Sequence, residues 1–312
     1  SPPRPHPHTA MTNLYSRAAP FAAVCVLACA APLTAQVSFT SPIAVSVDAP
    51  APGGADPGGQ AAKVKLVRLF KTPKAVHDGR LVAVWADANH DQTIWEPKGL
   101  EHLPRDIFAS YSDDEGATWS PPINVSRTAR LFSARTDWDG DGSPSEYWGD
   151  SGKPTLFASG DVVMVTWSDK YAPETTWSFG QTGESAIQGS VLYPDLAVYP
   201  NQREVPYAAV YAALSTDGGD TWTYGEVNPP LQLTYGRRDA INTVHKGAAG
   251  RWALAWQEDP EGLQKGEAEG PGSGASGSNV TKGTDIWYSW TADILPQASA
   301  LRGHRVPATD HS

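Results

Sequence analysis

One eight-residue phrase occurs twice in this chain, and it restricts the fold more than any other feature. The copies, SDDEGATW at 112–119 and STDGGDTW at 215–222, share the frame Ser-x-Asp-x-Gly-x-Thr-Trp. Each copy follows an apolar, aromatic-rich run that is typical of a β-strand. Asp accepts hydrogen bonds from nearby backbone N–H groups, and Gly supplies the positive φ that a tight turn needs. The phrase therefore predicts two equivalent hairpin turns, with Thr and Trp opening the next strand.

The composition fits a chain of many short strands joined by turns. The 312 residues include 29 Gly, 27 Pro and 12 Trp, and 40% are hydrophobic, which suffices for a buried core. The formal net charge is −10, and basic clusters are lacking. This balance argues against nucleic acid and anionic membranes as partners and disfavours an acidic substrate.

Residues 11–35 have the pattern of a secretory signal. Arg17 precedes an apolar core, and a small-residue exit predicts cleavage after Ala35, with Ala30 as the alternative. A weak lipobox would instead leave Cys29 lipidated at the mature N-terminus. We therefore expect a secreted, periplasmic or cell-surface protein. Beyond this segment, no stretch has the length and apolarity of a membrane span, so a transmembrane protein is not expected.

A second repeated pattern is an alternating apolar strand that ends in Trp-x-acid. It occurs three times, and the closing acids are Asp87, Asp169 and Glu258. Each copy has a candidate first strand before it and a candidate third strand after a long insertion. Fourth strands are expected near 123–125 and 231–233, directly after the two repeated phrases. The pattern predicts units of four antiparallel strands repeated along the chain, as in a propeller.

The repeated phrase resembles the Asp-box of sialidase-type β-propellers, and most of 64–290 is similar to that superfamily. The resemblance implies an all-β fold with about three four-stranded blades, half of a six-bladed ring. It also implies a structural rather than catalytic role for the box residues, which are Ser112, Asp114, Gly116, Thr118, Trp119, Ser215, Asp217, Gly219, Thr221 and Trp222. The stretch 258–285 resembles the choice-of-anchor group of bacterial exported proteins, for which no chemistry is implied.

The expected organisation has four parts. An upstream extension with the signal peptide (1–35) is followed by a linker (36–62), the blades (63–295) and an unstructured tail (296–312). Three blades cannot close a ring. We expect an incomplete gene product, and the alternatives are pairing with a second copy or an open stack of sheets.

The long insertions of the predicted blades, which carry many polar and aromatic residues, all lie on one side. The strand 2–3 connections, roughly 88–105, 170–206 and 259–284, lie on the same face as the blade-to-blade connections; we call it the insertion face. The boxes and the strand 1–2 turns lie on the opposite, box face. Loops commonly carry function, and the resemblance implies sugar binding on the insertion face. Five aromatic residues there could stack on sugars or pack their own loops: Trp95, Trp148, Trp177, Tyr193 and Tyr199.

An acidic run in the first blade-to-blade connection matches the opening of a calcium loop. Three carboxylates at alternate positions precede a Gly, and they belong to Asp137, Asp139 and Asp141. The twelfth position holds Trp148 instead of the expected Glu, which leaves Glu146 and Asp150 as candidate replacements. The alternative interpretation is a solvated acidic turn. A weaker calcium candidate comprises Asp87, Asn89 and Asp91, and no organic cofactor is expected.

Catalytic residues are much harder to assign. The resemblance implies an acid/base Asp in the first strand 2–3 connection, a Tyr–Glu nucleophile pair and three arginines. Asp91 is the weak candidate for the acid/base, with a loop carboxylate or metal ligand as the alternative. The family's Phe-Arg-Ile-Pro opening is absent from 67–70, and Arg237 and Arg238 do not make a triad. A glycosidase needs two positioned carboxyl groups, and the second is not identified.

Three functions therefore remain open at this point. The first is a secreted, non-catalytic sialidase-like propeller that binds a glycan or an extracellular protein through its insertion face. The second is an exo-α-sialidase-like glycoside hydrolase of which this chain is an incomplete N-terminal part. The third is a surface-anchored structural protein.

Overall fold

A computed structural model describes most of the chain and divides it into two compact units, Ser1–Pro42 and Ile43–Ser312. The predicted signal peptide lies outside the described residues, which except for Pro42 all belong to the second unit. The structure describes 42–46, 61–70, 76–96, 100–173, 175–179, 187–191, 194–199, 201–222, 231–234, 236, 238–248, 251–258, 268–269, 285–291 and 306–307. Within these ranges, no helix is long and apolar enough to cross a membrane.

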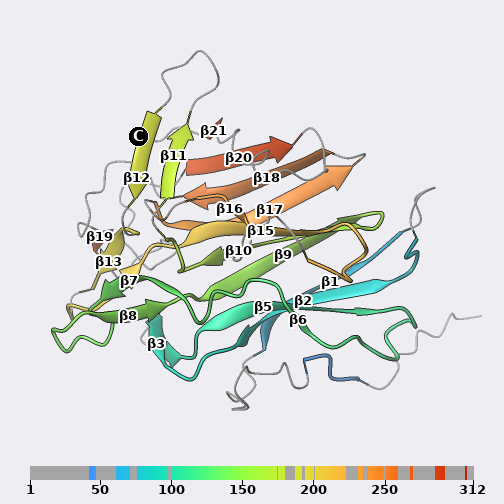
Figure 1. The fold of residues 1–312 in the computed structure, drawn as a ribbon, viewed down its shortest axis with the longest axis horizontal. Coiled ribbons are helices and arrows are strands. Elements are labelled where there is room, and N and C mark those ends of the chain that lie inside the picture. Colours follow the sequence, from blue (N-terminus) through green and yellow to red (C-terminus); the bar gives the residue numbers. More distant parts are fainter. Residues whose placement is uncertain are drawn as a thin grey trace, which may run out of the picture. The chain divides into compact units, whose positions relative to one another are not determined.

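Three four-stranded sheets succeed one another along the chain (Figure 1). In each sheet, neighbouring strands follow chain order and pair antiparallel, which is the arrangement of a propeller blade. Blade by blade, the strands are β1 (Ala62–Arg68), β2 (Leu81–Ala88), β5 (Arg105–Ser112) and β6 (Ile123–Asn124); β9 (Ser151–Ser159), β10 (Val162–Asp169), β15 (Ala209–Ser215) and β16 (Leu231–Gln232); β17 (Ala240–Ala248), β18 (Arg251–Glu258), β20 (Asp285–Thr291) and β21 (Val306–Pro307). The predicted fold class is confirmed: the chain is an all-β, partial propeller with three blades.

The blades pack on one another through the apolar faces that period-2 alternation creates. Between blades 1 and 2, Val84 and Ile107 pack in one core with Trp167, which is fully buried. Between blades 2 and 3, Met164 packs with Trp256 in a second core. Burying a large apolar side chain contributes about 2–3 kcal/mol. The inner strands β1, β9 and β17 lie next to one another, so the described blades form one continuous stack.

The two repeated phrases form the same hydrogen-bonded turn. In the first, the carboxylate of Asp114 accepts the backbone N–H of Thr118 at 2.8 Å and its hydroxyl at 2.6 Å. Ser112 donates its hydroxyl to the same carboxylate at 2.8 Å and accepts the N–H of Gly116, whose φ is +89°. The second phrase repeats each bond through Ser215, Asp217, Gly219 and Thr221, with φ +100° at its glycine.

Arg80 joins the two turns across the first blade interface. Its guanidinium donates to both oxygens of Asp113 at 2.7 and 2.8 Å, and to Asp220 in the second turn at 2.8 Å. The side chain is 5% exposed and lies 4.0 Å over the ring of Tyr111. The box face is therefore held together by one buried cation that is shared between two blades.

Two segments outside the predicted blades contact the blade strands. Val45 lies in the stretch expected to be an exposed linker or a loose first strand, and it packs half-buried beside the cluster of Ala83, Trp85 and Phe108. The tail expected to be unstructured contributes β21, which pairs with Trp287 and Tyr288 of β20. Val45 covers part of an apolar face of blade 1. β21 pairs with β20, which would otherwise be an edge strand with unpaired backbone groups.

The connections on the insertion face contain short paired strands that sequence periodicity did not reveal. They are β3 (Ile94–Glu96) with β4 (Leu100–His102), β7 (Phe132–Thr136) with β8 (Ser145–Trp148), β11 (Thr175–Phe179) with β12 (Ile187–Val191), and β13 (Leu196–Val198) with β14 (Glu204–Pro206) and β19 (Ala268–Glu269). Side chains from two insertions and from the connection between blades 1 and 2 form one separate aromatic core, which we call the insertion core: Ile94, Trp95, Tyr147, Ala197, Tyr199, Val205 and Tyr207.

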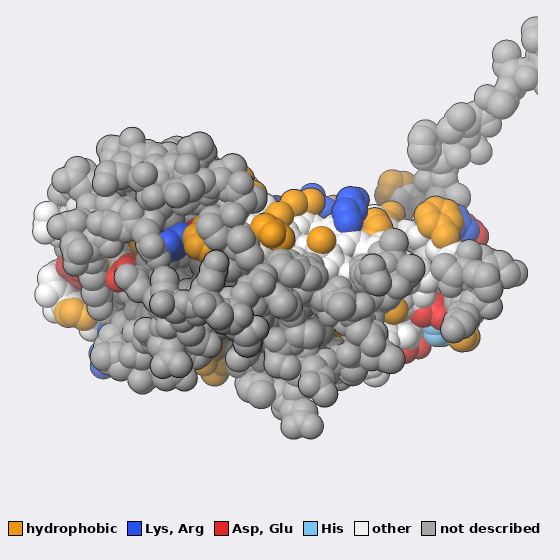
Figure 2. Space-filling model, turned by 90° about the horizontal axis from the view of Figure 1, so that it is seen from above, with side chains coloured by type: hydrophobic (Ala, Val, Ile, Leu, Met, Phe, Trp, Pro, Cys, Tyr) orange, Lys and Arg blue, Asp and Glu red, His pale blue; other side chains and the backbone are white. Residues whose placement is uncertain are grey.

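Some large apolar side chains stay exposed on the blades. Figure 2 shows hydrophobic side chains beside lysine and arginine side chains on one face of the molecule. On β1, Val64 and Leu66 are exposed, and Val244 of β17 and Ile286 of β20 are exposed on blade 3. By register, Ile286 corresponds to Ile107 of blade 1 and Val210 of blade 2, which pack in the cores shared with the following blade.

Candidate functional site

The candidate site lies on the insertion face, where the second strands end and the long connections begin. Each second strand closes with the predicted Trp-x-acid pair, and the indole N–H donates to the carboxylate two residues later. The Nε1-to-oxygen distances are 3.4 Å from Trp85 to Asp87, 3.2 Å in blade 2 and 2.9 Å in blade 3. Residues i and i+2 share a strand face, which places each pair side by side. The three closing carboxylates are thus held as structural acceptors.

A buried network of acids and hydroxyls joins blades 1 and 2 beneath this face. Asp106 is 1% exposed and accepts hydrogen bonds from the backbone N–H of Thr128 at 2.7 Å and the hydroxyl of Ser126 at 2.6 Å. The hydroxyl of Thr128 donates onward to Asp169 at 2.6 Å, and Ser151 donates to the same oxygen. Burial raises the pKa of Asp169 to about 6, although these hydroxyls oppose the shift.

Asp150 forms a second fixed group at the entrance to blade 2. It accepts from Nε of Arg105 at 2.9 Å and from Nη2 at 2.7 Å, and its side chain is 4% exposed. Burial disfavours the charged carboxylate, but the guanidinium outweighs burial and lowers the pKa of Asp150 below its usual range. Asp150 is therefore engaged by Arg105 and does not lie in the acidic loop as a replacement calcium ligand.

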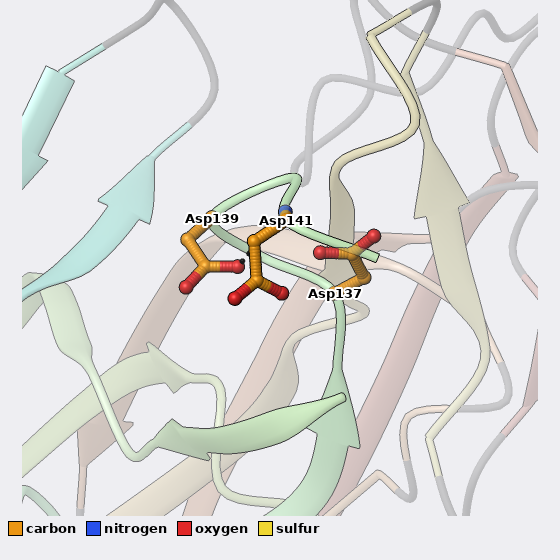
Figure 3. A group of neighbouring side chains, drawn as sticks. All are labelled: Asp137, Asp139 and Asp141. Atoms are coloured by element: carbon orange, nitrogen blue, oxygen red, sulfur yellow. Dashed lines mark hydrogen bonds between the residues drawn. The ribbon is translucent and has the colours of Figure 1, made fainter. Parts of the chain in front are cut away.

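The acidic loop brings its three predicted carboxylates together. Ligand oxygens of Asp137, Asp139 and Asp141 all lie within 4.8 Å of one another (Figure 3). Gly142 has φ +86° and donates its N–H to Asp137 at 3.0 Å. The other oxygen of Asp137, Oδ1, is fully buried and has no hydrogen-bond donor. That oxygen is the feature of the loop that fits a cation.

Sequence spacing missed the carboxylate that lies closest to this loop. Glu204 of β14 accepts the backbone N–H of Asp137 at 3.1 Å and donates its own N–H to the carbonyl of Asp137 at 3.0 Å. Glu146, the other expected replacement for the twelfth position, faces Arg135 at 3.5 Å instead. Because Asp137 and Glu204 are 67 positions apart in the sequence, only the fold could reveal this pairing.

The weaker calcium candidate does not converge in the same way. Asp87 accepts from its own strand, and Asn89 donates its side-chain amide to Asp106 at 2.7 Å. Asp91 is 69% exposed and lies 3.3 Å from Nδ1 of His90. Asp91 is therefore an open loop carboxylate beside a histidine, while its two predicted companions point to other partners.

Aromatic side chains of the insertions divide into buried and accessible groups. Trp95 and Tyr199 are each 5% exposed and pack edge to face at 4.6 Å in the insertion core. Trp148 is half-buried and lies over His90, with ring centroids 4.4 Å apart. Phe132, which the sequence did not single out, is 44% exposed and meets Trp148 edge to face at 5.4 Å. The Trp177 side chain and Tyr193 lie outside the described residues.

The arginines considered for a substrate carboxylate have other contacts. Arg68 forms an ion pair with Glu115 of the first box turn, so it lies on the box face. Arg238 is 9% exposed, with Nη1 3.9 Å from Glu258 and its guanidinium 4.4 Å over the ring of Trp287. Arg237 lies outside the described residues. Neither described arginine is directed toward Asp91 by any of these contacts.

Comparison with known proteins found only solved structures of low sequence identity. No protein-family model and no curated protein matches the sequence. Among solved structures, an α-L-arabinanase of Penicillium chrysogenum complexed with arabinobiose is 14% identical, over 78% of this chain and 49% of its own, with a TM-score of 0.38. The GH93 α-L-arabinofuranosidase of Fusarium graminearum is 10% identical over the same shares, with a TM-score of 0.38. The intramolecular trans-sialidase from Ruminococcus gnavus is 10% identical over 81% and 61%, with a TM-score of 0.39. The chain thus spans about half the length of the two fungal structures.

Proposed function

We propose that this chain is part of an exported, non-catalytic sialidase-like propeller that binds a glycan through its insertion face. The observation that carries the proposal is the insertion core. It fixes hairpins from three connections into one body, with Arg203 lying 5.2 Å over the ring of Trp95 and Glu204 bonded to the acidic loop. A rigid, aromatic-rich body beside exposed polar side chains suits ligand binding.

The non-catalytic part of the proposal rests on how the carboxylates are used. Asp106, Asp150 and Asp169 are buried and saturated by hydroxyl, amide or guanidinium donors. A glycosidase needs a second carboxyl group facing the same sugar as the first. These three buried acids are not available to act with the exposed Asp91, and the exposed Glu101 of the same connection faces Arg203 at 3.9 Å.

Calcium is proposed as a stabiliser of the acidic loop. Asp137, Asp139 and Asp141 would supply carboxylate oxygens as ligands. Glu204 of the neighbouring hairpin would supply a further oxygen ligand. Added calcium is expected to raise the melting temperature relative to a chelator, and Asp139→Asn should reduce that shift. Asp78→Asn, outside the loop, should leave it unchanged. Equal melting with calcium and chelator would contradict the site.

The function is tested by incubating the purified protein with a printed oligosaccharide array and, separately, with a fluorogenic sialoside. We expect saturable binding to a subset of glycans and no turnover. Turnover that exceeds a mock preparation would overturn the non-catalytic assignment and favour the hydrolase alternative. An array with no bound glycan would overturn glycan binding.

A further inference from the structure

We propose that Phe132, Trp148, His90 and Asp91 form a subsite for a neutral pyranose ring on the insertion face. This inference rests on the proposed glycan-binding function and specifies where the sugar lies and what kind of sugar it is. Two of the four residues, Phe132 and His90, were not identified from the sequence.

The aromatic part of the subsite is fixed by the β7–β8 hairpin. Phe132 and Trp148 are cross-strand partners in that hairpin, and their rings meet at an interplanar angle of 84°. Cross-strand packing holds such a pair in one geometry. The exposed part of Phe132 therefore offers a rigid apolar surface. A pyranose can place its C–H face against the negative face of an aromatic ring.

The histidine supplies a directed hydrogen-bond donor beside that surface. Gln92 donates its backbone N–H to Nδ1 of His90 at 2.8 Å, so the proton of the neutral ring resides on Nε2. Burial lowers the pKa of His90, which keeps the ring neutral at pH 7. No described residue accepts from Nε2, and this nitrogen is not among the fully buried polar atoms that lack a partner. Nε2 therefore carries a proton for which no described residue is an acceptor, in a side chain that is 6% exposed.

Asp91 adds the complementary acceptor. Its carboxylate is 69% exposed and lies next to His90, with Oδ1 3.3 Å from Nδ1. Sugar hydroxyls both donate and accept, so the Nε2–H donor and the carboxylate on the Nδ1 side of the imidazole can engage different hydroxyls of one ring. The carboxylate would repel an anionic sugar, and the chain carries a net charge of −10. These charges favour a neutral ring over a sialylated one, even though Arg130 lies close enough to act on His90.

The test compares Phe132→Ala with Phe70→Ala on the oligosaccharide array. Phe70 follows β1 near the strand 1–2 turn of blade 1 and is 73% exposed, so the second variant removes an exposed phenylalanine ring from outside the subsite. We expect Phe132→Ala to weaken binding to neutral glycans about tenfold, a typical loss for a buried anchor at an interface. Phe132→Tyr should retain binding because it keeps the ring, and Phe70→Ala should match the unmodified protein. Asp91→Asn should weaken binding as well.

The possible results separate the subsite from the wider function. If the unmodified protein binds no glycan, both the proposed function and the subsite fail. If it binds glycans and Phe132→Ala binds equally well, the subsite alone is overturned. Binding restricted to sialylated glycans would overturn the assignment to a neutral sugar. Thermal melting of each variant shows whether a loss of binding reflects a loss of folding.

Discussion

At the residue scale, each box turn depends on one carboxylate and one hydroxyl. The Asp accepts two hydrogen bonds from the Thr four residues later, and the Ser bridges that carboxylate and the Gly N–H. These bonds lower the pKa of Asp114 to about 2, so that carboxylate stays ionised through mildly acidic pH. Because the second turn also receives Arg80 through Asp220, it supports a blade interface as well as its own hairpin.

Replacing Asp217 by Ala should destabilise the protein by about 2 kcal/mol. The change leaves the hydroxyls of Ser215 and Thr221 and one backbone N–H without their acceptor. The free energy of unfolding in denaturant provides the measurement. Glu115→Gln serves as the control, since it removes an exposed ion pair that contributes little. A loss for Asp217→Ala no greater than for the control would show that the turn does not need its carboxylate.

At the scale of elements, the blade strands were predictable and the insertion hairpins were not. The strands β2, β10 and β18 combine period-2 alternation with the Trp-x-acid ending, and they appear within a residue or two of the expected positions. Strands such as β13 and β14 have three residues each, which is too short for a periodic signal. They form because apolar side chains such as Val205 enter the insertion core, and that tertiary effect leaves no local pattern.

The candidate site was predictable only where its residues are close in sequence. The acidic loop follows from alternate carboxylates before a Gly, and its three oxygens do converge. Arg105 and Asp150 lie 45 residues apart, and their ion pair depends on how blades 1 and 2 meet. The contact of His90 with Trp148 likewise joins two connections that only the fold brings together.

Replacing Arg80 by Met should loosen the first blade interface and cost about 2 kcal/mol. The substitution leaves Asp113 and Asp220 close together without the cation between them, and their partial exposure keeps the loss below that of a fully buried pair. Chemical denaturation measures the change. Arg68→Met, which removes an exposed ion pair with Glu115, is the matched control and should change stability by less than about 0.5 kcal/mol. Equal losses of stability in the two variants would show that Arg80 does not hold the first blade interface together.

At the scale of the whole molecule, two buried groups at the two blade interfaces respond to acid in opposite directions. His245 accepts from the hydroxyl of Thr166 at 3.1 Å and donates to the carbonyl of Met164 at 2.9 Å, and burial lowers its pKa to about 4. Its contribution to stability is therefore present above pH 6.5 and is lost as pH falls toward 4. Asp169, with its pKa raised to about 6, stabilises the fold below pH 3.8, and that contribution is lost as pH rises through 6. Each shift corresponds to about 3 kcal/mol.

We therefore expect the free energy of unfolding to change little between pH 7 and pH 4.5 in the unmodified protein. In the Asp169→Asn variant, the destabilising effect of His245 at low pH is no longer offset. The free energy of unfolding should therefore fall by about 2 kcal/mol from pH 7 to pH 4.5. In His245→Gln, stability should rise over the same range, less the smaller opposing effect of His90, whose pKa burial also lowers. Denaturant titrations at several pH values provide the comparison. If the free energy of unfolding varied with pH in the same way in all three proteins, neither group would change its pKa on folding, which would contradict the prediction.

The central claim is that ligand binding belongs to the insertion face and not to the box face. Hydrogen–deuterium exchange of the protein alone and saturated with an array-selected neutral oligosaccharide tests it most directly. Binding at the insertion face predicts slower exchange at 89–92 and 130–148, with no change at 112–119 and 215–222. Protection confined to the two box turns, with unchanged exchange across the insertion hairpins, would contradict it.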